Sequence, residues 1–280
     1  MEILSVSGLT KRYPGFTLDG AAFTVEKGEI MGLIGRNGAG KSTTLKSLTG
    51  LIHPDGGDIR FFALPLAGNE REIRRRMAYM SGGVDYYQRK KLKAITAVSR
   101  DFYEDRWDEN AYRRFMSLFN LSEDKTPAQL SAGMRVKYSL TLAMSHRAEL
   151  LILDEPTSGL DPVSRDEIID AFLQLQREGV SILFSTHITA DLEKCADRLT
   201  YISRGRVLAC EPLKAFTARY RFVQMADVPD ALRPRLIGLK QAKKGFTALI
   251  SGEDAEALRV EARPATLEEI MVHLEKENEQ

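Results

Sequence analysis

Hydrophobic and polar positions along the chain predict strands that alternate with helices. Two partly alternating runs near the N-terminus, EILSVSGL and FTLDGAAFTV, predict strands separated by turn residues. Short continuous apolar runs at residues 29–34, 150–153 and 180–185 predict strands that are buried on both faces. Strands alternating with helices form mostly parallel sheets covered on both sides, so the predicted fold class is α/β.

Two segments depart from this alternation. Residues 84–146 are rich in Phe, Tyr, Arg and Glu, and their apolar positions recur at helical spacing, which predicts a helical lobe. From about residue 218, strand-like runs lie among Pro, Gly and charged residues, and a capping box at Thr266 to Glu269 begins a last helix. We therefore predict a main domain at residues 1–217 and a small α+β accessory module at residues 218–280.

Composition excludes several classes of protein. The formal net charge of +1 over 280 residues gives no reason to expect nucleic-acid binding. Short basic clusters at residues 74–76 and 89–91 suit solvated faces or a contact with a partner or lipid. Cys195 and Cys210 lack metal-ligand spacing and fit a reducing cytosol. We find no signal peptide and no apolar run of the ~20 residues that cross a bilayer, so work at a membrane would need a partner.

A glycine-rich motif after the run at residues 29–34 defines the candidate chemistry. It matches the pattern G-x-x-x-x-G-K-[ST] and comprises Gly35, Arg36, Asn37, Gly38, Ala39, Gly40, Lys41 and Ser42, followed by Thr43. Glycines let the backbone wrap around a polyanion, and the N–H groups at the start of the next helix favour it. We expect Lys41 to bridge the β- and γ-phosphates of a nucleotide and Ser42 to hold Mg²⁺.

A second motif supplies two carboxylates. Four apolar residues precede Asp154 and Glu155, which places both acids at the C-terminal end of a central strand. Ligands bind at that edge of open α/β sheets. We expect Asp154 to hold Mg²⁺, directly or through water, and Glu155 to act on the attacking water as the general base. An apolar strand ending in acids is common by itself, so this assignment depends on the phosphate loop.

Between the two motifs lies Leu130-Ser131-Ala132-Gly133-Met134, followed by a helical pattern. With it, the chain resembles the nucleotide-binding subunits of ABC transporters, whose signature is usually LSGGQ. The resemblance covers about residues 1–215. Tyr13 matches the aromatic that stacks on adenine, residues 158–161 match the D-loop, and His187 matches the switch histidine at the γ-phosphate. Taken alone, Ser131 would be an ordinary helix cap and His187 a structural histidine, and only the ordered set of motifs favours the other roles.

The resemblance implies a RecA-like core, an antiparallel β lobe and a helical subdomain that bind ATP with Mg²⁺. It also implies two such subunits stacked head to tail, so that Ser131, Ala132 and Gly133 of one face the ATP of the other. Residues 103–108 and the tail at 263–270 are similar to drug- and antibiotic-peptide exporters, in which the permease is a separate chain. We therefore expect an ATPase at the inner face of the membrane, held there by a permease. The cargo and the choice between homodimer and heterodimer stay open.

One position departs from the family pattern. Relatives carry a Pro-Gln pair after a strand like residues 77–80, whereas this chain has Ser81 and Gly82. Three explanations stay open: water fills the missing Mg²⁺ ligand position, Asp85 or Gln88 substitutes, or the site is impaired and the chain is mainly regulatory. Ala132 and Met134 also depart from LSGGQ.

Two alternatives to a transporter subunit come from other classes of protein. One is a soluble ABC ATPase of translation or DNA repair, although these usually carry two ATPase domains or a long coiled-coil insertion. The other is a regulatory nucleotide-binding module with weak turnover. The aromatic-rich segment at residues 86–107 is a candidate for the permease contact, and core packing of the helical lobe explains it equally well.

Overall fold

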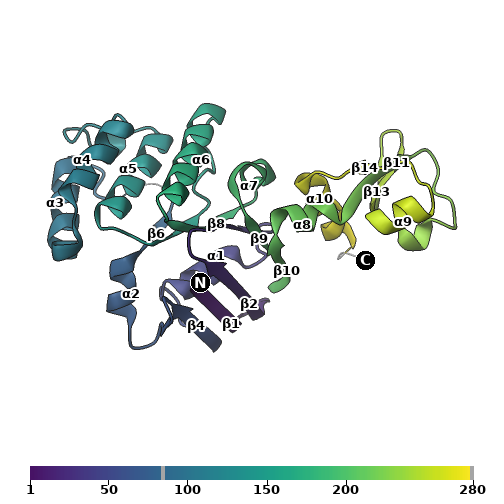
Figure 1. The fold of residues 1–280 in the computed structure, drawn as a ribbon, viewed down its shortest axis with the longest axis horizontal. Coiled ribbons are helices and arrows are strands. Elements are labelled where there is room, and N and C mark those ends of the chain that lie inside the picture. Colours follow the sequence, from purple (N-terminus) through teal and green to yellow (C-terminus); the bar gives the residue numbers. More distant parts are fainter. Residues whose placement is uncertain (83–85, 278–280) are drawn as a thin grey trace.

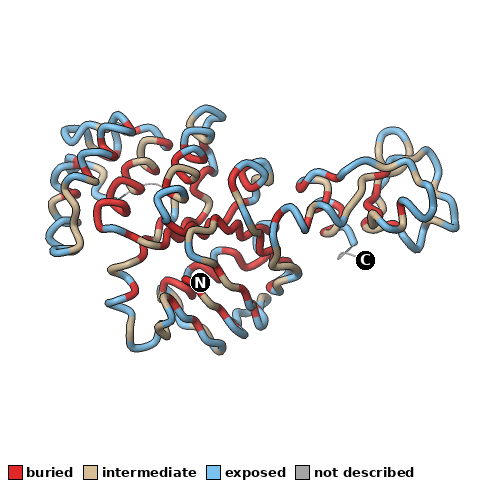
Figure 2. The backbone as a smooth tube through the Cα atoms, in the orientation of Figure 1, coloured by how far each residue is buried: buried red, intermediate tan, exposed pale blue. Residues whose placement is uncertain are grey.

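A computed structural model describes residues 1–82 and 86–277. Its described residues form three β-sheets, with helices above the central sheet, an antiparallel sheet below it and a third sheet extending to one side (Figure 1). Buried residues concentrate along the central sheet and the helices that face it, whereas more of the residues around the third sheet are exposed (Figure 2). No helix in the described part of the chain is long and apolar enough to cross a membrane.

The central sheet has six strands in the order β10-β9-β3-β8-β7-β6. Neighbouring strands from β9 to β6 are parallel, and only the edge strand β10 is antiparallel. The strands of the sheet are β3 (Ile30–Ile34), β6 (Met77–Ser81), β7 (Leu150–Asp154), β8 (Ser181–Thr186), β9 (Arg198–Ser203) and β10 (Arg206–Pro212). Every residue of β3, β7 and β8 is buried, as their continuous apolar runs predict.

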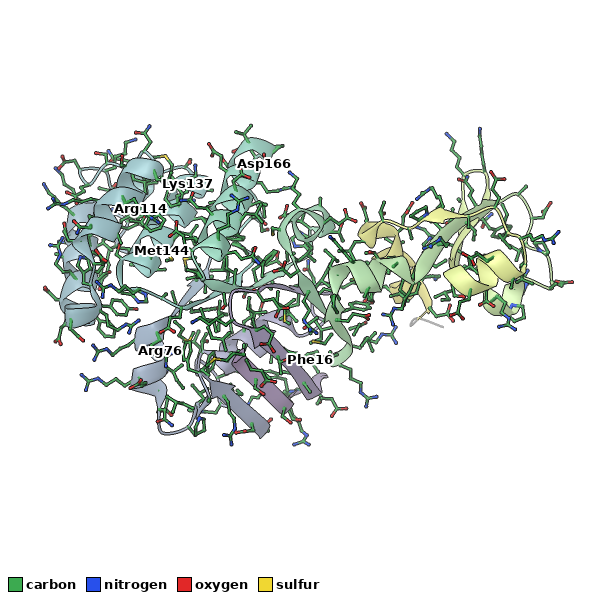
Figure 3. All side chains as sticks on the ribbon, in the orientation of Figure 1. Phe16, Arg76, Arg114, Lys137, Met144 and Asp166 are labelled. Atoms are coloured by element: carbon green, nitrogen blue, oxygen red, sulfur yellow. The ribbon has the colours of Figure 1, made fainter. Side chains whose placement is uncertain are left out.

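The second sheet covers one face of the central sheet. It is antiparallel, and its strands are β1 (Glu2–Tyr13), β2 (Phe16–Glu26), β4 (Gly56–Phe61) and β5 (Leu64–Pro65). Helix α1 (Lys41–Leu48) lies between the two sheets, because Leu45 and Leu48 share one apolar cluster with residues of both. Helix α2 (Glu70–Arg76) leads into β6, and Arg76 (labelled in Figure 3) donates two hydrogen bonds to Glu149 before β7.

Helices cover the opposite face of the central sheet. The predicted helical lobe contains α3 (Leu92–Tyr103), α4 (Glu109–Leu118) and α5 (Ala132–Ser145), with short 3₁₀ turns at Glu104–Arg106 and Pro127–Gln129. Helices α6 (Pro162–Arg177) and α7 (Thr189–Cys195) complete this layer. Asp161 caps α6 by accepting hydrogen bonds from the N–H groups of Val163 and Ser164. Of the apolar positions that suggested the lobe, Phe102 is exposed and faces no core.

The third sheet forms most of the C-terminal module. Helix α8 (Leu213–Ala218) runs across the predicted boundary at residue 217, and the strand order beyond it is β12-β13-β11-β14. The remaining elements are β11 (Tyr220–Met225), the 3₁₀ turn Arg233–Arg235, β12 (Ile237–Ala242), β13 (Gly245–Ser251), α9 (Gly252–Ala257), β14 (Arg263–Pro264) and α10 (Leu267–Glu277). The capping box is present, since Thr266 and Glu269 exchange hydrogen bonds between side chain and backbone.

Candidate functional site

The phosphate loop, residues 35–42, connects β3 to α1. Gly38 and Gly40 have φ angles of 81° and 116°, a left-handed conformation that glycine adopts without steric cost. Gly35 also needs its missing side chain, because a Cβ there would lie 2.1 Å from the carbonyl oxygen of Ile202 in β9. The loop is therefore seated tightly against the sheet, with the first N–H groups of α1 directed toward it.

Lys41 is the first residue of α1 and has only 6% of its side chain exposed. Its ammonium group donates a hydrogen bond of 2.8 Å to the carbonyl oxygen of Gly35 and lies 3.5 Å from Glu155 Oε1. A buried ammonium needs such partners, because removing a charge from water is costly. The ammonium group of Lys41 thus lies between a backbone carbonyl of the loop and the carboxylate of Glu155.

Three oxygen-bearing side chains meet beside the loop. Ser42 Oγ lies 3.3 Å from Asp154 Oδ1, and Ser185 Oγ donates a 2.6 Å hydrogen bond to the same oxygen. Burial raises the pKa of nearby Tyr79, and the charge of Asp154 raises it further. Hydroxyl and carboxylate oxygens are the ligands that Mg²⁺ prefers, so Ser42 and Asp154 fit the ion that the sequence predicts.

Glu155 stands in an unusual backbone conformation at the end of β7. Its φ angle is 51°, and its N–H group donates to both the carbonyl oxygen and Oγ of Ser185. His187 Nδ1 lies 2.8 Å from Glu155 Oε2. A left-handed non-glycine residue costs about 1–3 kcal/mol and persists only where its surroundings hold it. Here the neighbouring strand β8 supplies both anchors of Glu155 and leads to His187.

The signature segment, residues 130–134, lies away from the phosphate loop. Ser131 caps α5 by accepting a hydrogen bond from the N–H group of Met134 at 3.2 Å, and both Ser131 and Ala132 are exposed. Gly133 packs against α6, where a Cβ would lie 3.0 Å from Ser164 Cβ. Helices α5 and α1 contact opposite faces of the central sheet. A single chain therefore does not bring the signature segment together with its own phosphate loop.

Tyr13 lies at the tip of the β1–β2 hairpin and is 42% exposed. It pairs with Phe16, whose ring would meet a Cβ at Gly40 at 3.1 Å. The hairpin tip is therefore close to the end of the phosphate loop, although Tyr13 itself faces solvent. The nearest charge over its ring is Lys11 Nζ, 5.8 Å from the ring centroid.

Gly82 follows β6 and lies beside the carboxylates. Its N–H group donates to the carbonyl oxygen of Asp154 at 3.2 Å, so Gly82 lies directly beside the end of β7. Its φ angle is 70°, and a Cβ there would meet no atom within 4 Å. Space is therefore open for a side chain, but the backbone favours glycine. Of the two proposed substitutes, Asp85 lies outside the described residues, and the backbone carbonyl of Gln88 accepts from Ala128.

Sequence reasoning missed Ser185. It stands in the apolar run at residues 180–185, where a small polar residue gives no signal of a role. In the structure it is fully buried and contacts both Asp154 and Glu155. One signal could have identified Ser185: a polar residue near the C-terminal end of a predicted central strand, where the parallel register places it opposite a predicted acid.

A phosphate loop between a buried strand and a helix, on a parallel sheet, is the arrangement of P-loop nucleotide-binding proteins. Comparison with protein families narrows this class. The family model described as "ABC transporter" matches residues 18–158. The chain belongs to this family, and it is an ATP-binding subunit of the ABC transporter type, as the sequence resemblance indicates.

Curated relatives match over most of the chain. The ABC transporter ATP-binding protein YtrB of Bacillus subtilis (strain 168) is 30% identical over 266 residues, which are 92% of this chain and 90% of that protein. The bacitracin transport ATP-binding protein BcrA of Bacillus licheniformis is 32% identical and matches 82% of this chain and 77% of its own length. These alignments continue beyond residues 18–158.

Solved structures support the fold. The ATP-binding subunit of an ABC transporter is similar with a TM-score of 0.68 and 32% identity, over 76% of this chain and 91% of that one. The cbiO1 protein of Clostridium perfringens, part of the ABC transporter complex cbiONQ, has a TM-score of 0.67 and 25% identity, over 78% and 91% of the two chains. The predicted ABC ATPase fold is therefore confirmed.

The first prediction concerns Ser185. Ser185→Ala should lower kcat/KM for ATP hydrolysis by about tenfold or more, because a buried hydrogen bond to a charged group is worth ~1.5–3 kcal/mol. The matched control is Ser181→Ala, on the same strand but at its other end, where Oγ accepts from the N–H group of Gly28. Steady-state hydrolysis and thermal unfolding of both variants separate the effects. Equal kcat/KM values in the two variants would contradict the prediction.

The second prediction concerns Gly82. Gly82→Ala and Gly82→Gln should each lose about 1–2 kcal/mol of stability through the left-handed backbone. Both should hydrolyse ATP at the same rate on the first of the three explanations above, in which water fills the Mg²⁺ ligand position. Thermal unfolding and ATPase rates test this, with the alanine variant as the control for strain. A glutamine variant more than about tenfold faster than the alanine variant would show that the natural site lacks a ligand.

Proposed function

We propose that this chain hydrolyses ATP and thereby drives export through a separate membrane permease. The observation that supports it most is a chain of two contacts at the edge of the central sheet. Lys41 Nζ lies 3.5 Å from Glu155 Oε1, and Glu155 Oε2 lies 2.8 Å from His187 Nδ1. Each comes from a different segment of the chain. A phosphate-binding lysine, a candidate base and a histidine converge there on the space beside the phosphate loop.

Each residue has a role that follows from its chemistry. The N–H groups of the loop and Lys41 bind the phosphates of ATP, and Tyr13 stacks on the base. Ser42 and Asp154 would hold Mg²⁺, which would neutralise phosphate charge. Glu155 accepts the proton of the attacking water, and His187 bonds to the γ-phosphate. Ser185 keeps Asp154 and the backbone of Glu155 in position through the hydrogen bonds described above.

Two copies are needed to complete this site. The signature residues Ser131, Ala132 and Gly133 begin α5 and point to solvent or α6, so they remain free to meet the ATP of a second subunit. The N-terminus of a helix favours a negatively charged phosphate. In a head-to-tail dimer, ATP joins the subunits and its hydrolysis releases them. The second subunit is either another copy or a related chain.

A hydrophobic patch beside Gly82 is the proposed permease contact. A cavity of about 560 Å³ lies between β6, α3 and α5, and its lining includes Gly82, Tyr103 and His146. Phe102 is 72% exposed and Tyr86 51% exposed at its rim. Exposed apolar patches of this kind mark contacts with partners. Helical segments of a permease that dock here would lie one strand away from Asp154.

The predicted segment at residues 86–107 thus divides between two roles. Tyr103 stacks on His146 with ring centroids 3.8 Å apart, and Trp107 packs in the small core of the helical lobe. Burial lowers the pKa of His146 to about 4, so its ring is neutral at pH 7. Tyr103 and His146 line the cavity, whereas the side chains of Phe102 and Tyr86 are largely exposed at its rim.

Export rather than import is proposed from the relatives. BcrA is named for bacitracin transport, and other relatives are named Nod factor export ATP-binding proteins. The similarity of residues 103–108 and 263–270 to exporters agrees with this direction. We place the chain at the cytoplasmic face of the membrane, bound to its permease, with residues 218–280 as an accessory module.

The experiment that tests the function is Glu155→Gln. This variant should lose ATP hydrolysis by at least about 100-fold, since a general base contributes 10²–10⁴. It should form a dimer with ATP but not with ADP, because the sandwich can no longer reopen. Steady-state hydrolysis and light scattering after gel filtration measure both. Glu167→Gln, an exposed carboxylate on α6, is the matched control and should behave as the wild type.

Two outcomes contradict the proposal. Normal ATP binding without turnover in the wild type would favour the regulatory module. A Glu155→Gln variant that stays monomeric with ATP, while the wild type hydrolyses it, would exclude the sandwich of two identical copies.

The permease contact has its own test. Phe102→Ser should release the protein from the membrane fraction of cells that make it, because an apolar anchor is lost, while ATP hydrolysis by the purified chain stays unchanged. Leu258→Ser, at a 45% exposed residue of the C-terminal module, is the control and should stay with the membrane. Equal distribution of the two variants between membrane and soluble fractions would refute this docking surface.

A further inference from the structure

Helix α10 of the C-terminal module packs directly on elements of the nucleotide site. Its apolar residues Leu267, Ile270 and Met271 belong to the same buried cluster as Leu192 of α7 and Tyr201 of β9. The two elements that it covers border the site: α7 begins just after His187, and β9 lies beside β3, which leads into the phosphate loop. The C-terminal module therefore shares part of its hydrophobic core with the ATPase domain.

Two hydrogen bonds fix α10 at its ends. Glu193 Oε1 of α7 accepts from the N–H group of Leu267 at 2.8 Å, at the start of α10. Near its other end, Glu275 Oε1 accepts a buried hydrogen bond of 2.7 Å from Tyr201 Oη. Hydrogen bonds are specific in direction, so these two contacts define where α10 lies along α7 and β9.

Helix α7 in turn contacts two segments that lead to the site, β3 and the segment after Glu155. Leu192 fills the space over Gly32 of β3, where a Cβ would lie 1.9 Å from Leu192 Cδ2. Asp191 is buried and accepts a 2.6 Å hydrogen bond from Thr157, in the segment after Glu155. A displacement of α7 would therefore shift the position of His187 and of the loop that carries Thr157.

A cavity that is partly open to solvent also lies between this contact and the site. This cavity of about 710 Å³ is lined by Arg36 of the phosphate loop, His187 and Ile188 on one side, and by Met271 and Glu275 of α10 on another. Close packing does not hold His187 from this side, so the attachment of α7 to α10 acts on its position together with β8 and Glu155.

The module can transmit force to α10 through its own sheet. Gly238 of β12 donates to Glu277 Oε2, and its carbonyl oxygen lies 2.6 Å from His273 Nδ1. A Cβ at Gly238 would lie 1.8 Å from the carbonyl oxygen of His273, so β12 and α10 approach as closely as glycine permits. Movement of the sheet and movement of α10 are thereby coupled.

We propose that the C-terminal module regulates hydrolysis by positioning the switch histidine: α10 holds α7 through Glu193 and holds β9 through Tyr201 and Glu275. These are positioning residues, since they act through His187 and touch no substrate. The inference rests on the proposed ATP hydrolysis. Contacts that a partner makes with the module would change the rate of hydrolysis through this path.

The test is Glu193→Ala in the full-length chain, which removes the bond to Leu267 from an exposed position and leaves the core unchanged. Lys194→Ala is the matched control. Lys194 is the next residue along α7 and is also exposed, but its side chain pairs with Asp166 of α6 and not with α10. We expect Glu193→Ala to lower kcat about three- to tenfold with KM for ATP unchanged, since misplacing a catalytic group costs rate more than binding. Tyr201→Phe should act in the same way.

A second measurement does not depend on turnover. Hydrogen exchange at residues 186–190 should be faster in Glu193→Ala than in Lys194→Ala. Absence of hydrolysis in the wild type would refute the proposed function, and exchange would still decide this inference. If kcat and exchange in Glu193→Ala equal those of Lys194→Ala, the module has no positioning role. A fall in thermal stability with unchanged kcat and exchange would equally overturn it.

Discussion

The parallel register of the central sheet is the constraint on which the site depends. Ile34 pairs with Thr186, Asp154 with Ser185, and Ser81 with Asp154, so the ends of the four neighbouring strands β3, β8, β7 and β6 lie within one residue of each other at one edge. Residues that follow these ends are therefore adjacent in space although they lie far apart in the sequence. A slip of one residue would turn each strand to its opposite face and separate the phosphate loop from the carboxylates.

The same register explains why one chain is insufficient. Burial of β3, β7 and β8 on both faces requires a layer on each side of the sheet, and these layers are the antiparallel sheet with α1 and the helices α3 to α7. The phosphate loop leads into α1 in one layer, and the signature segment begins α5 in the other layer. A stable sheet thus keeps these two anion-binding helix ends apart within a subunit. A second subunit, which we propose above, is the simplest way to unite them.

Much of this could be predicted from sequence, for a physical reason. Continuous apolar runs have few other uses than buried strands, and a loop that wraps phosphate needs glycines and lysine in one order, so β3, β7, β8 and residues 35–42 were predictable. Ser185 was not, because its role depends on the strand next to it. The exposure of Phe102 was missed because helical spacing alone does not say which face is covered. Strand β11 was missed since Tyr220–Met225 gives no clear alternation.

The boundary at residue 217 shows what composition cannot reveal. The pattern of apolar and polar residues changes there because the parallel central sheet gives way to the antiparallel third sheet, which is a local property of the chain. The hydrophobic packing is continuous across this boundary. Leu249 and Leu267 lie in the same buried cluster as Leu192 and Phe172 of the ATPase fold. Burial of apolar area stabilises both parts together, at roughly 25 cal/mol per Å². A module joined in this way cannot move without cost to α7, and this shared core makes a regulatory coupling physically reasonable.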